Sequence, residues 1–144
     1  MSLKIREFNP IDLDVILSIE KECFDKDAFD RNIFLEFYKT EPYGFLIGEY
    51  NSKIIGYVIT SAERNGDIMS IAVLPKYRGK GIGSSLLKKG LEILKSKNVE
   101  SVRLMVRKSN IVARNFYRKH KFEEAKIMKN HYGDEDALFM YKKI

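Results

Sequence analysis

The segment Val73–Gly83 has the sequence VLPKYRGKGIG and joins an apolar run to a helix-forming run. Before it, the β-branched residues Ile68 and Ile71 predict a strand. After it, apolar residues recur at helical spacing: Ile82, Leu86, Leu87, Leu91 and Leu94. A glycine-rich loop between a strand and a helix leaves backbone N–H groups free at a helix N-terminus, where anions bind. Because Arg78 and Lys80 add positive charge, we expect a ligand that carries phosphates.

Two common phosphate-binding motifs do not fit this loop. The P-loop pattern G-x-x-x-x-G-K-[ST] is absent from the sequence. The dinucleotide pattern G-x-G-x-x-G fails because Gly79 and Gly81 are followed by Ser84 at the third glycine position. A tight turn without a ligand is the remaining alternative, although a turn alone does not require three glycines beside Arg78.

The composition is that of an ordinary globular protein, and 144 residues predict one domain over residues 1–144. The net charge of +6 is spread along the chain, without a basic run interleaved with aromatic residues, so we expect no nucleic-acid partner. The charge suits an anionic cofactor or a lysine-rich thermophile surface. A single cysteine, Cys23, and the lack of a signal peptide or membrane-spanning run predict a cytoplasmic protein that does not bind membranes.

Periodicity along the chain predicts elements in the order βααβββαβαββ. Strands are expected over residues 3–8, 45–50, 53–59, 68–74, 99–106, 122–129 and 137–142. Helices are expected over residues 10–24, 30–38 and 82–97, and from residue 109 onward. These elements predict an α/β (α+β) fold, with a mixed sheet of about seven strands and about four helices on its two faces. The strand after the long helix should run parallel to the strand before it.

Several motifs together resemble one enzyme family. Arg78–Gly83 is similar to the R/Q-x-x-G-x-G/A signature of the GCN5-related N-acetyltransferase (GNAT) superfamily, which binds the pyrophosphate of acetyl-CoA. Val106–Asn110, followed by Ala113 and Tyr117, resembles the family's V-R-x-S-N…A-x-x-x-Y-x-K segment. Lys129–Ala137 resembles the N-Y-Y-x-x-G-x-D-A loop of the RimI and Ard branch, whose members acetylate protein N-termini. The resemblance covers nearly the whole chain.

The resemblance implies the GNAT fold, in which two parallel strands splay apart to admit the pantetheine arm of acetyl-CoA. It places that arm beside a strand containing Ile71, Ala72 and Val73, with the Val73 N–H polarising the thioester carbonyl. It implies a pyrophosphate site on the backbone N–H groups of Arg78, Gly79, Lys80, Gly81, Ile82, Gly83 and Ser84. Asn110 and Ala113 are implied on the pantetheine side, and Tyr117 as the acid that protonates the leaving thiolate. From the residues alone, the alternatives are a half-buried helix aromatic beside Phe116 for Tyr117 and a helix cap for Asn110, which is compatible with its cofactor role.

One departure from the branch concerns the general base. Many relatives read L-E-V-R where this chain has Met105, and a thioether is not a useful proton acceptor. Asp67 and Glu63 are the alternative bases, although Asp67 also suits a turn after Asn65-Gly66. An α-amino group has a pKa of about 7.7–8.0, against about 10.4 for lysine, so it tolerates the loss of a base better. Met105 therefore favours peptide N-termini over lysine side chains.

The family's L-G-F after the cofactor helix is replaced by His120-Lys121-Phe122. If Lys121 adopts the left-handed conformation at this C-cap, the cost is on the order of 1 kcal/mol. We interpret His120 as a surface residue and Cys23 as a core residue.

The loop Asn130–Asp136, which we call the late loop, and the loop Asp25–Phe29 after the first predicted helix should line the pocket for the acceptor amine. The substrate-binding residues expected there are Phe24, Phe29, His131 and Tyr132. We expect acetyl-CoA as co-substrate, no metal, a peptide N-terminus as acceptor, and a monomer or a homodimer. The alternatives are acetylation of lysine or of a small amine, and a non-catalytic module that binds acyl-CoA.

Overall fold

The structure is a computed structural model that describes residues 2–144, and its centre is a seven-stranded sheet. The strands lie in the order β1-β2-β3-β4-β5-β7-β6. Their bounds are β1 (Leu3–Glu7), β2 (Phe45–Tyr50), β3 (Lys53–Ser61), β4 (Asp67–Val73), β5 (Ser101–Arg107), β6 (Glu123–Met128) and β7 (Ala137–Lys143). The neighbours β4 and β5 are parallel, as the sequence predicts, whereas the other neighbouring pairs are antiparallel.

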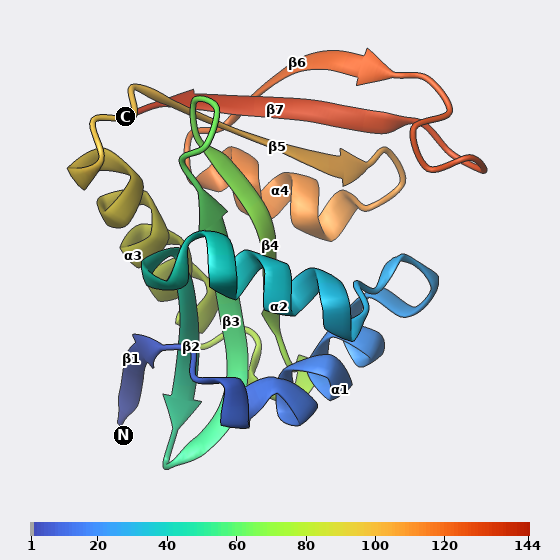
Figure 1. The fold of residues 1–144 in the computed structure, drawn as a ribbon. Coiled ribbons are helices and arrows are strands. Elements are labelled where there is room, and N and C mark those ends of the chain that lie inside the picture. Colours follow the sequence, from blue (N-terminus) through green and yellow to red (C-terminus); the bar gives the residue numbers. More distant parts are fainter. Residues whose placement is uncertain (1) are drawn as a thin grey trace.

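In the described part of the chain, four α-helices cover the sheet: α1 (Leu13–Phe24), α2 (Arg31–Thr40), α3 (Ile82–Ser96) and α4 (Ile111–Lys119). Successive side chains of a strand point to opposite faces, and this alternation separates the two helix layers. Ile47 packs with α1 and α2, whereas its neighbour Leu46 packs with α3. Figure 1 shows α1 and α2 crossing in front of β3 and β4. The predicted mixed sheet with helices on both faces is confirmed.

Side-chain caps fix where three helical segments begin. Asn9 forms a capping box with the 3-10 turn Pro10–Asp12, which precedes α1. Asp30 accepts a hydrogen bond from the Ile33 N–H at the start of α2, and Asn110 caps α4 in the same way. Asn, Asp and Ser are the residues that sequence reasoning can recognise at such positions.

α3 ends at Ser96, one residue before the predicted end, but the turn that closes it continues to Val99, so β5 begins at Ser101 and not at Val99. Asn98 has a φ of 64°, and the Val99 N–H donates to the Leu94 carbonyl at 3.2 Å. These two features close the helix C-terminus and use Val99 for that purpose. Lys121 has a φ of 71°, so the strained position expected after α4 is present.

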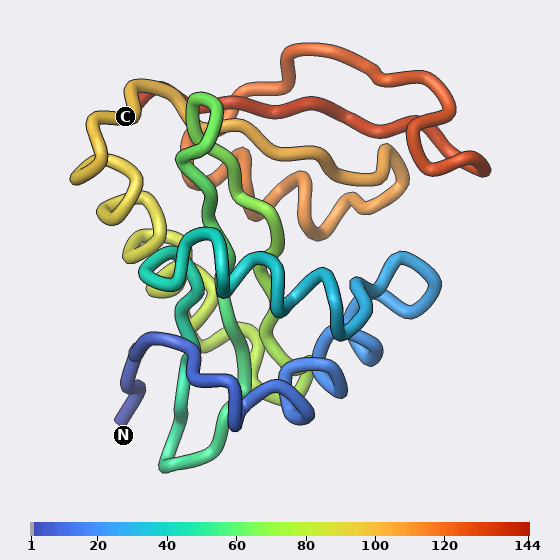
Figure 2. Tube along the Cα trace, viewed as in Figure 1, coloured from blue at the N-terminus to red at the C-terminus, as the bar shows by residue number. Residues whose placement is uncertain are grey.

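The parallel strands β4 and β5 meet at one end and then separate. Their ladder contains one residue pair, Asp67 with Arg103. Figures 1 and 2 show β5, β7 and β6 running side by side away from the direction of β2, β3 and β4. Within residues 2–144, the C-terminal part of β4 therefore has no strand on its β5 side.

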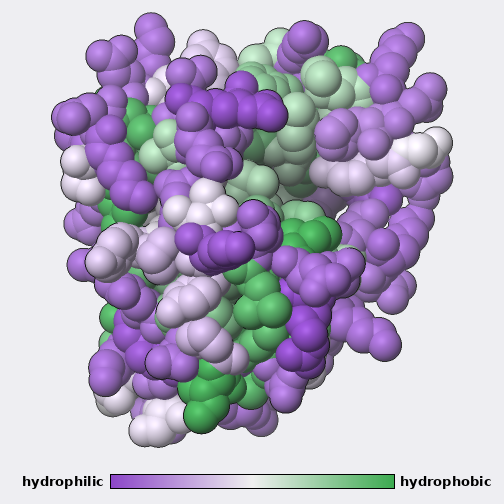
Figure 3. Space-filling view, viewed as in Figure 1, coloured by the Kyte–Doolittle hydropathy of each residue, from purple (hydrophilic) through white to green (hydrophobic). Residues whose placement is uncertain are grey.

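Hydrophilic residues are spread over the face of the molecule shown in Figure 3, with apolar areas between them. Among residues 2–144, no helix is both long enough and apolar enough to cross a bilayer.

Candidate active site

The loop before α3 presents an open group of backbone amides. Gly79 and Gly81 have φ values of 78° and 80°, a conformation that side-chain-bearing residues adopt at a cost. A Cβ at either glycine would meet no atom within 4 Å, so the space outside this turn is open. The first hydrogen bond of α3 runs from Ser85 N–H to Gly81 carbonyl at 3.0 Å.

Within the part of the chain that the structure describes, no backbone N–H group from Gly79 to Ser84 donates to a protein acceptor. We call these N–H groups the amide cradle. They combine with the positive end of the α3 dipole, so the cradle has the properties of a phosphate site.

Arg78 shapes the loop and does not belong to the amide cradle. Its N–H donates to the Pro75 carbonyl at 3.2 Å, and its Nε donates to the Val73 carbonyl at 2.8 Å. Its Nη2 lies 3.6 Å from Cys23 Sγ. The amide cradle therefore begins at Gly79, because the Arg78 N–H is engaged in the preceding turn, and a contribution of that N–H to a phosphate site stays a prediction.

The free edge of β4 follows from its pairing with β3. Leu74 N–H donates to the Ile55 carbonyl at 2.9 Å, and hydrogen-bonded pairs alternate in an antiparallel ladder. The N–H and C=O groups of Ala72 therefore face β3, whereas those of Ile71 and Val73 face the opening toward β5. Of the three strand residues expected at the cofactor, Ile71 can pair with an extended ligand, and Val73 can do so through its N–H, since its carbonyl accepts from Arg78 Nε. Ala72 can contribute only its side chain.

On α4, Asn110 and Tyr117 take the positions expected from the motif. The Asn110 Oδ1 accepts a hydrogen bond from the Ala113 N–H at 3.1 Å, which confirms its cap role and leaves its side-chain NH2 without a partner among residues 2–144. Tyr117 is buried, with 8% exposure. Burial raises the pKa of Tyr117, and nearby Tyr132 raises it further. Tyr117 is therefore protonated at neutral pH, as a proton donor must be.

The structure does not bring Asp67 into the opening between the strands. Asp67 lies where β4 and β5 are still paired, and its Oδ1 accepts a hydrogen bond from Arg103 Nε at 2.8 Å. Ile71 is four residues along the strand, a rise of about 13 Å. Glu63 is exposed beyond the end of β3. A base role for Asp67 or Glu63 stays a prediction that requires intervening water. Met105, at the position where many relatives have glutamate, is 37% exposed on β5.

Arg107, which the motif contains but the sequence reasoning did not assign, joins the two predicted acceptor loops. Its Nη2 donates to Asp27 Oδ1 at 2.7 Å in the loop after α1. Its Nη1 donates to Asp134 Oδ1 at 2.9 Å and to Glu135 Oε1 at 3.1 Å in the loop between β6 and β7. The guanidinium also lies 4.4 Å above the Tyr132 ring. The Asp27 carboxylate, followed by Asp134, raises the pKa of Arg107.

The four residues expected in the amine pocket have different environments. Phe24 and Phe29 are half-buried in the apolar cluster beneath α2, and the Phe29 ring lies 5.5 Å from that of Phe37. His131 is exposed and packs edge-on against Tyr132, with ring centroids 4.9 Å apart. Tyr132 is half-buried close to Tyr117. The late loop thus reaches the predicted acid, while Phe29 mainly anchors its own loop.

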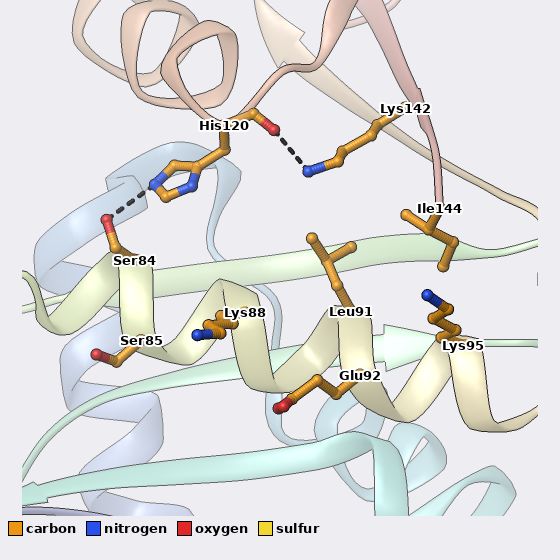
Figure 4. Close-up of a pocket in the computed structure, with 9 residues that line it drawn as sticks. All are labelled: Ser84, Ser85, Lys88, Leu91, Glu92, Lys95, His120, Lys142 and Ile144. Carbon is orange, nitrogen blue, oxygen red and sulfur yellow. Dashed lines mark hydrogen bonds between the residues drawn. The ribbon is translucent and has the colours of Figure 1, made fainter.

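A pocket of about 460 Å³ begins beside the amide cradle (Figure 4). Its lining residues are Ser84, Ser85, Lys88, Leu91, Glu92, Lys95, His120, Lys142 and Ile144. His120, expected at the surface, is half-buried, and its Nε2 lies 2.8 Å from Ser84 Oγ. Burial lowers the pKa of His120, and Lys119 and Lys142 lower it further. No local sequence signal predicts this contact, because it depends on how α4 packs beside α3.

Comparison with known proteins identifies the family. The sequence model of the Acetyltransferase (GNAT) family matches residues 13–122. An uncharacterized N-acetyltransferase of Methanocaldococcus jannaschii is 38% identical over 143 residues, which cover 96% of this chain and 90% of that protein. The chain belongs to the GNAT acetyltransferase family. It is therefore an N-acetyltransferase by family, and the predicted resemblance is confirmed.

Further relatives place the chain near one branch of the GNAT family. An N-alpha-acetyltransferase of Sulfurisphaera tokodaii is 32% identical over 95% of this chain and 90% of its own length. The crystal structure of Ard1 from Thermoplasma volcanium has a TM-score of 0.94 at 26% identity, with 100% of this chain and 99% of that chain covered. The GNAT fold is thus shared along the entire chain.

Proposed function

We propose that residues 1–144 form one catalytic domain that transfers the acetyl group of acetyl-CoA to the α-amine of peptide N-termini. The observation that carries this proposal is a row of backbone N–H groups that have no partner among residues 2–144. The free N–H groups of Ile71 and Val73 lead directly to the amide cradle of Gly79–Ser84. Such a path suits an extended arm followed by a diphosphate, which is the chemical plan of coenzyme A.

In this proposal the chain supplies a hydrogen-bond donor to the thioester carbonyl, a proton donor to the leaving sulfur and a candidate base for the amine. Acetyl-CoA supplies an activated acetyl group as a thioester. The Val73 N–H, free on the β5 side, donates to the carbonyl oxygen as negative charge develops on it. The neutral amine forms a C–N bond with the carbonyl carbon, the C–S bond breaks, and Tyr117 donates its proton to the departing sulfur. The proton lost by the amine passes to water, with Asp67 or Glu63 as the candidate bases beyond it.

Two features support an N-terminal α-amine as acceptor. Met105 provides no base, and an α-amine is about 10% neutral at pH 7, whereas lysine is below about 0.1%. The Arg107 contacts also hold the loop with Asp27 against the loop with Tyr132, so both predicted acceptor loops lie at the opening of the splayed strands. The S. tokodaii relative is named as an N-alpha-acetyltransferase.

The experiment is a mass-spectrometric comparison of three acceptors with acetyl-CoA: peptides with free N-termini, N-blocked peptides containing lysine, and polyamines. We expect acetylation of the free N-termini at the α-amine. Modification of lysine or polyamines alone would favour the other enzymatic alternative. Binding of acetyl-CoA without CoA release in the presence of any acceptor would favour the non-catalytic module.

A further inference from the structure

Glu20, near the C-terminal end of α1, is a carboxylate with 1% exposure. Its Oε1 accepts hydrogen bonds from the Tyr57 hydroxyl and, at 3.4 Å, from Ser70 Oγ. Its Oε2 accepts a hydrogen bond from the Phe29 N–H at 3.0 Å. A buried carboxylate is costly unless donors satisfy it, and these three donors do so. None of the catalytic steps proposed above uses Glu20.

The three donors come from parts of the chain whose relative positions matter for the proposed reaction. Tyr57 belongs to β3, Ser70 belongs to β4 one residue before Ile71, and Phe29 belongs to the loop between α1 and α2. Cys23, one turn after Glu20 on the same face of α1, places its Sγ 3.7 Å from the Val73 carbonyl. The last turn of α1 therefore contacts β4 on both sides of Ile71 while it holds the following loop.

We infer that Glu20 is a positioning residue that fixes the acceptor loop relative to the cofactor strand. The inference rests on the proposed function, because it assigns the loop to the acceptor and β4 to acetyl-CoA. Glu20 touches neither reactant and acts through Phe29 on one side and Ser70 on the other. It therefore sets acceptor affinity and alignment, and leaves the amide cradle unchanged.

The chemistry of the contact distinguishes two substitutions. In Glu20→Gln, the amide oxygen can still accept the Phe29 N–H, and the NH2 can donate to the Tyr57 or Ser70 hydroxyl, since hydroxyls also accept. In Glu20→Leu, the Phe29 N–H and both hydroxyls lose their acceptor. An alignment error of about 1 Å can cost roughly 10²-fold in rate.

Glu41 offers a matched control. It accepts hydrogen bonds from a serine hydroxyl (Ser61, 2.6 Å) and a backbone N–H (Ala62, 2.8 Å), as Glu20 does, and it pairs with Lys97. It lies at the opposite end of α2 from Phe29, about 15 Å away along the helix axis. Glu41→Leu therefore removes comparable contacts and stability without releasing the acceptor loop.

The test measures peptide KM, acetyl-CoA Kd and hydrogen exchange of the Phe29 amide by NMR in the full chain. In Glu20→Leu we expect a 10- to 100-fold rise in peptide KM, unchanged acetyl-CoA Kd and at least tenfold faster Phe29 exchange. Glu20→Gln should stay within threefold of wild type in all three, and Glu41→Leu should leave peptide KM and Phe29 exchange unchanged.

The inference is overturned if Glu20→Leu keeps the wild-type peptide KM, or if Glu41→Leu raises that KM equally. A separate outcome concerns the proposed function. If wild-type protein binds acetyl-CoA but acetylates no peptide N-terminus, the proposed acceptor class is wrong. The Phe29 exchange rates then decide alone whether Glu20 holds the loop, and unchanged exchange in Glu20→Leu rejects its positioning role.

Discussion

Replacing Gly81 by Ala should weaken acetyl-CoA binding at least as much as it weakens the fold. Gly81 has a φ of 80° and is the N-cap residue of α3. An alanine in this left-handed region costs about 1–2 kcal/mol. Its Cβ would meet no protein atom within 4 Å, so no steric clash adds to that cost. The free energy of unfolding should therefore fall by about 1–2 kcal/mol.

Binding of acetyl-CoA also weakens, because the substituted turn can respond in two ways and both are unfavourable. The turn either relaxes, which rotates N–H groups away from the ligand, or stays, which leaves a methyl group in the open space outside the loop. A hydrogen bond to a charged group contributes about 1.5–3 kcal/mol. Loss of one such bond raises the Kd about 10- to 100-fold, since about 1.4 kcal/mol is tenfold.

Isothermal titration calorimetry with acetyl-CoA measures this Kd directly, and Gly133→Ala is the matched control. Gly133 has a φ of 84°, and a Cβ there would also meet no atom within 4 Å, but it lies in the loop between β6 and β7. Gly133→Ala should show the same loss of stability and unchanged acetyl-CoA affinity. Wild-type affinity in Gly81→Ala, or an equal loss in Gly133→Ala, would refute the assignment of the amide cradle.

Three further outcomes are expected. Tyr117→Phe should lower kcat by about 10²-fold or more with little change in acetyl-CoA KM, because it removes the proposed proton donor to the leaving thiolate; a kcat within threefold of wild type contradicts this role. Burial raises the pKa of Glu20, so its stabilising contribution is complete below its ordinary pKa and is lost as pH rises through the folded value. Denaturant unfolding should therefore show Glu20→Gln gaining stability over wild type as pH rises above the ordinary glutamate pKa of 4.5, and a difference independent of pH counts against it. Lys88 lines the pocket one turn after Ser84. If the 3′-phosphate of CoA lies near Lys88, Lys88→Glu should raise the Kd of CoA more than the Kd of dephospho-CoA, which lacks that phosphate, and the difference should shrink at high salt. Equal changes in the two Kd values at low salt exclude a phosphate near Lys88.

Local sequence patterns were sufficient for most of the backbone. The alternation Val102, Leu104 and Val106 predicts the buried face of β5, and these residues are buried in the structure. Asn110 is recognisable as a cap because its short side chain reaches the N–H three residues later. The glycines at 79 and 81 indicate left-handed turns, which both adopt. In each case a few neighbouring residues carry the physical cause, so the pattern is visible in the linear chain.

The contacts that complete the site join residues that are far apart in the sequence. Arg107 meets Asp27 across 80 residues, and Ser84 meets His120 across 36. Ala72 turns its amide toward β3 while its neighbours on both sides turn theirs toward the opening, a distinction set by strand register. Asp67 forms an ion pair with Arg103 because these two residues make the single pair of the β4–β5 ladder. Periodicity and turn chemistry describe the conformation of a short segment, but which distant groups meet depends on strand pairing and helix packing, and only the folded chain fixes those.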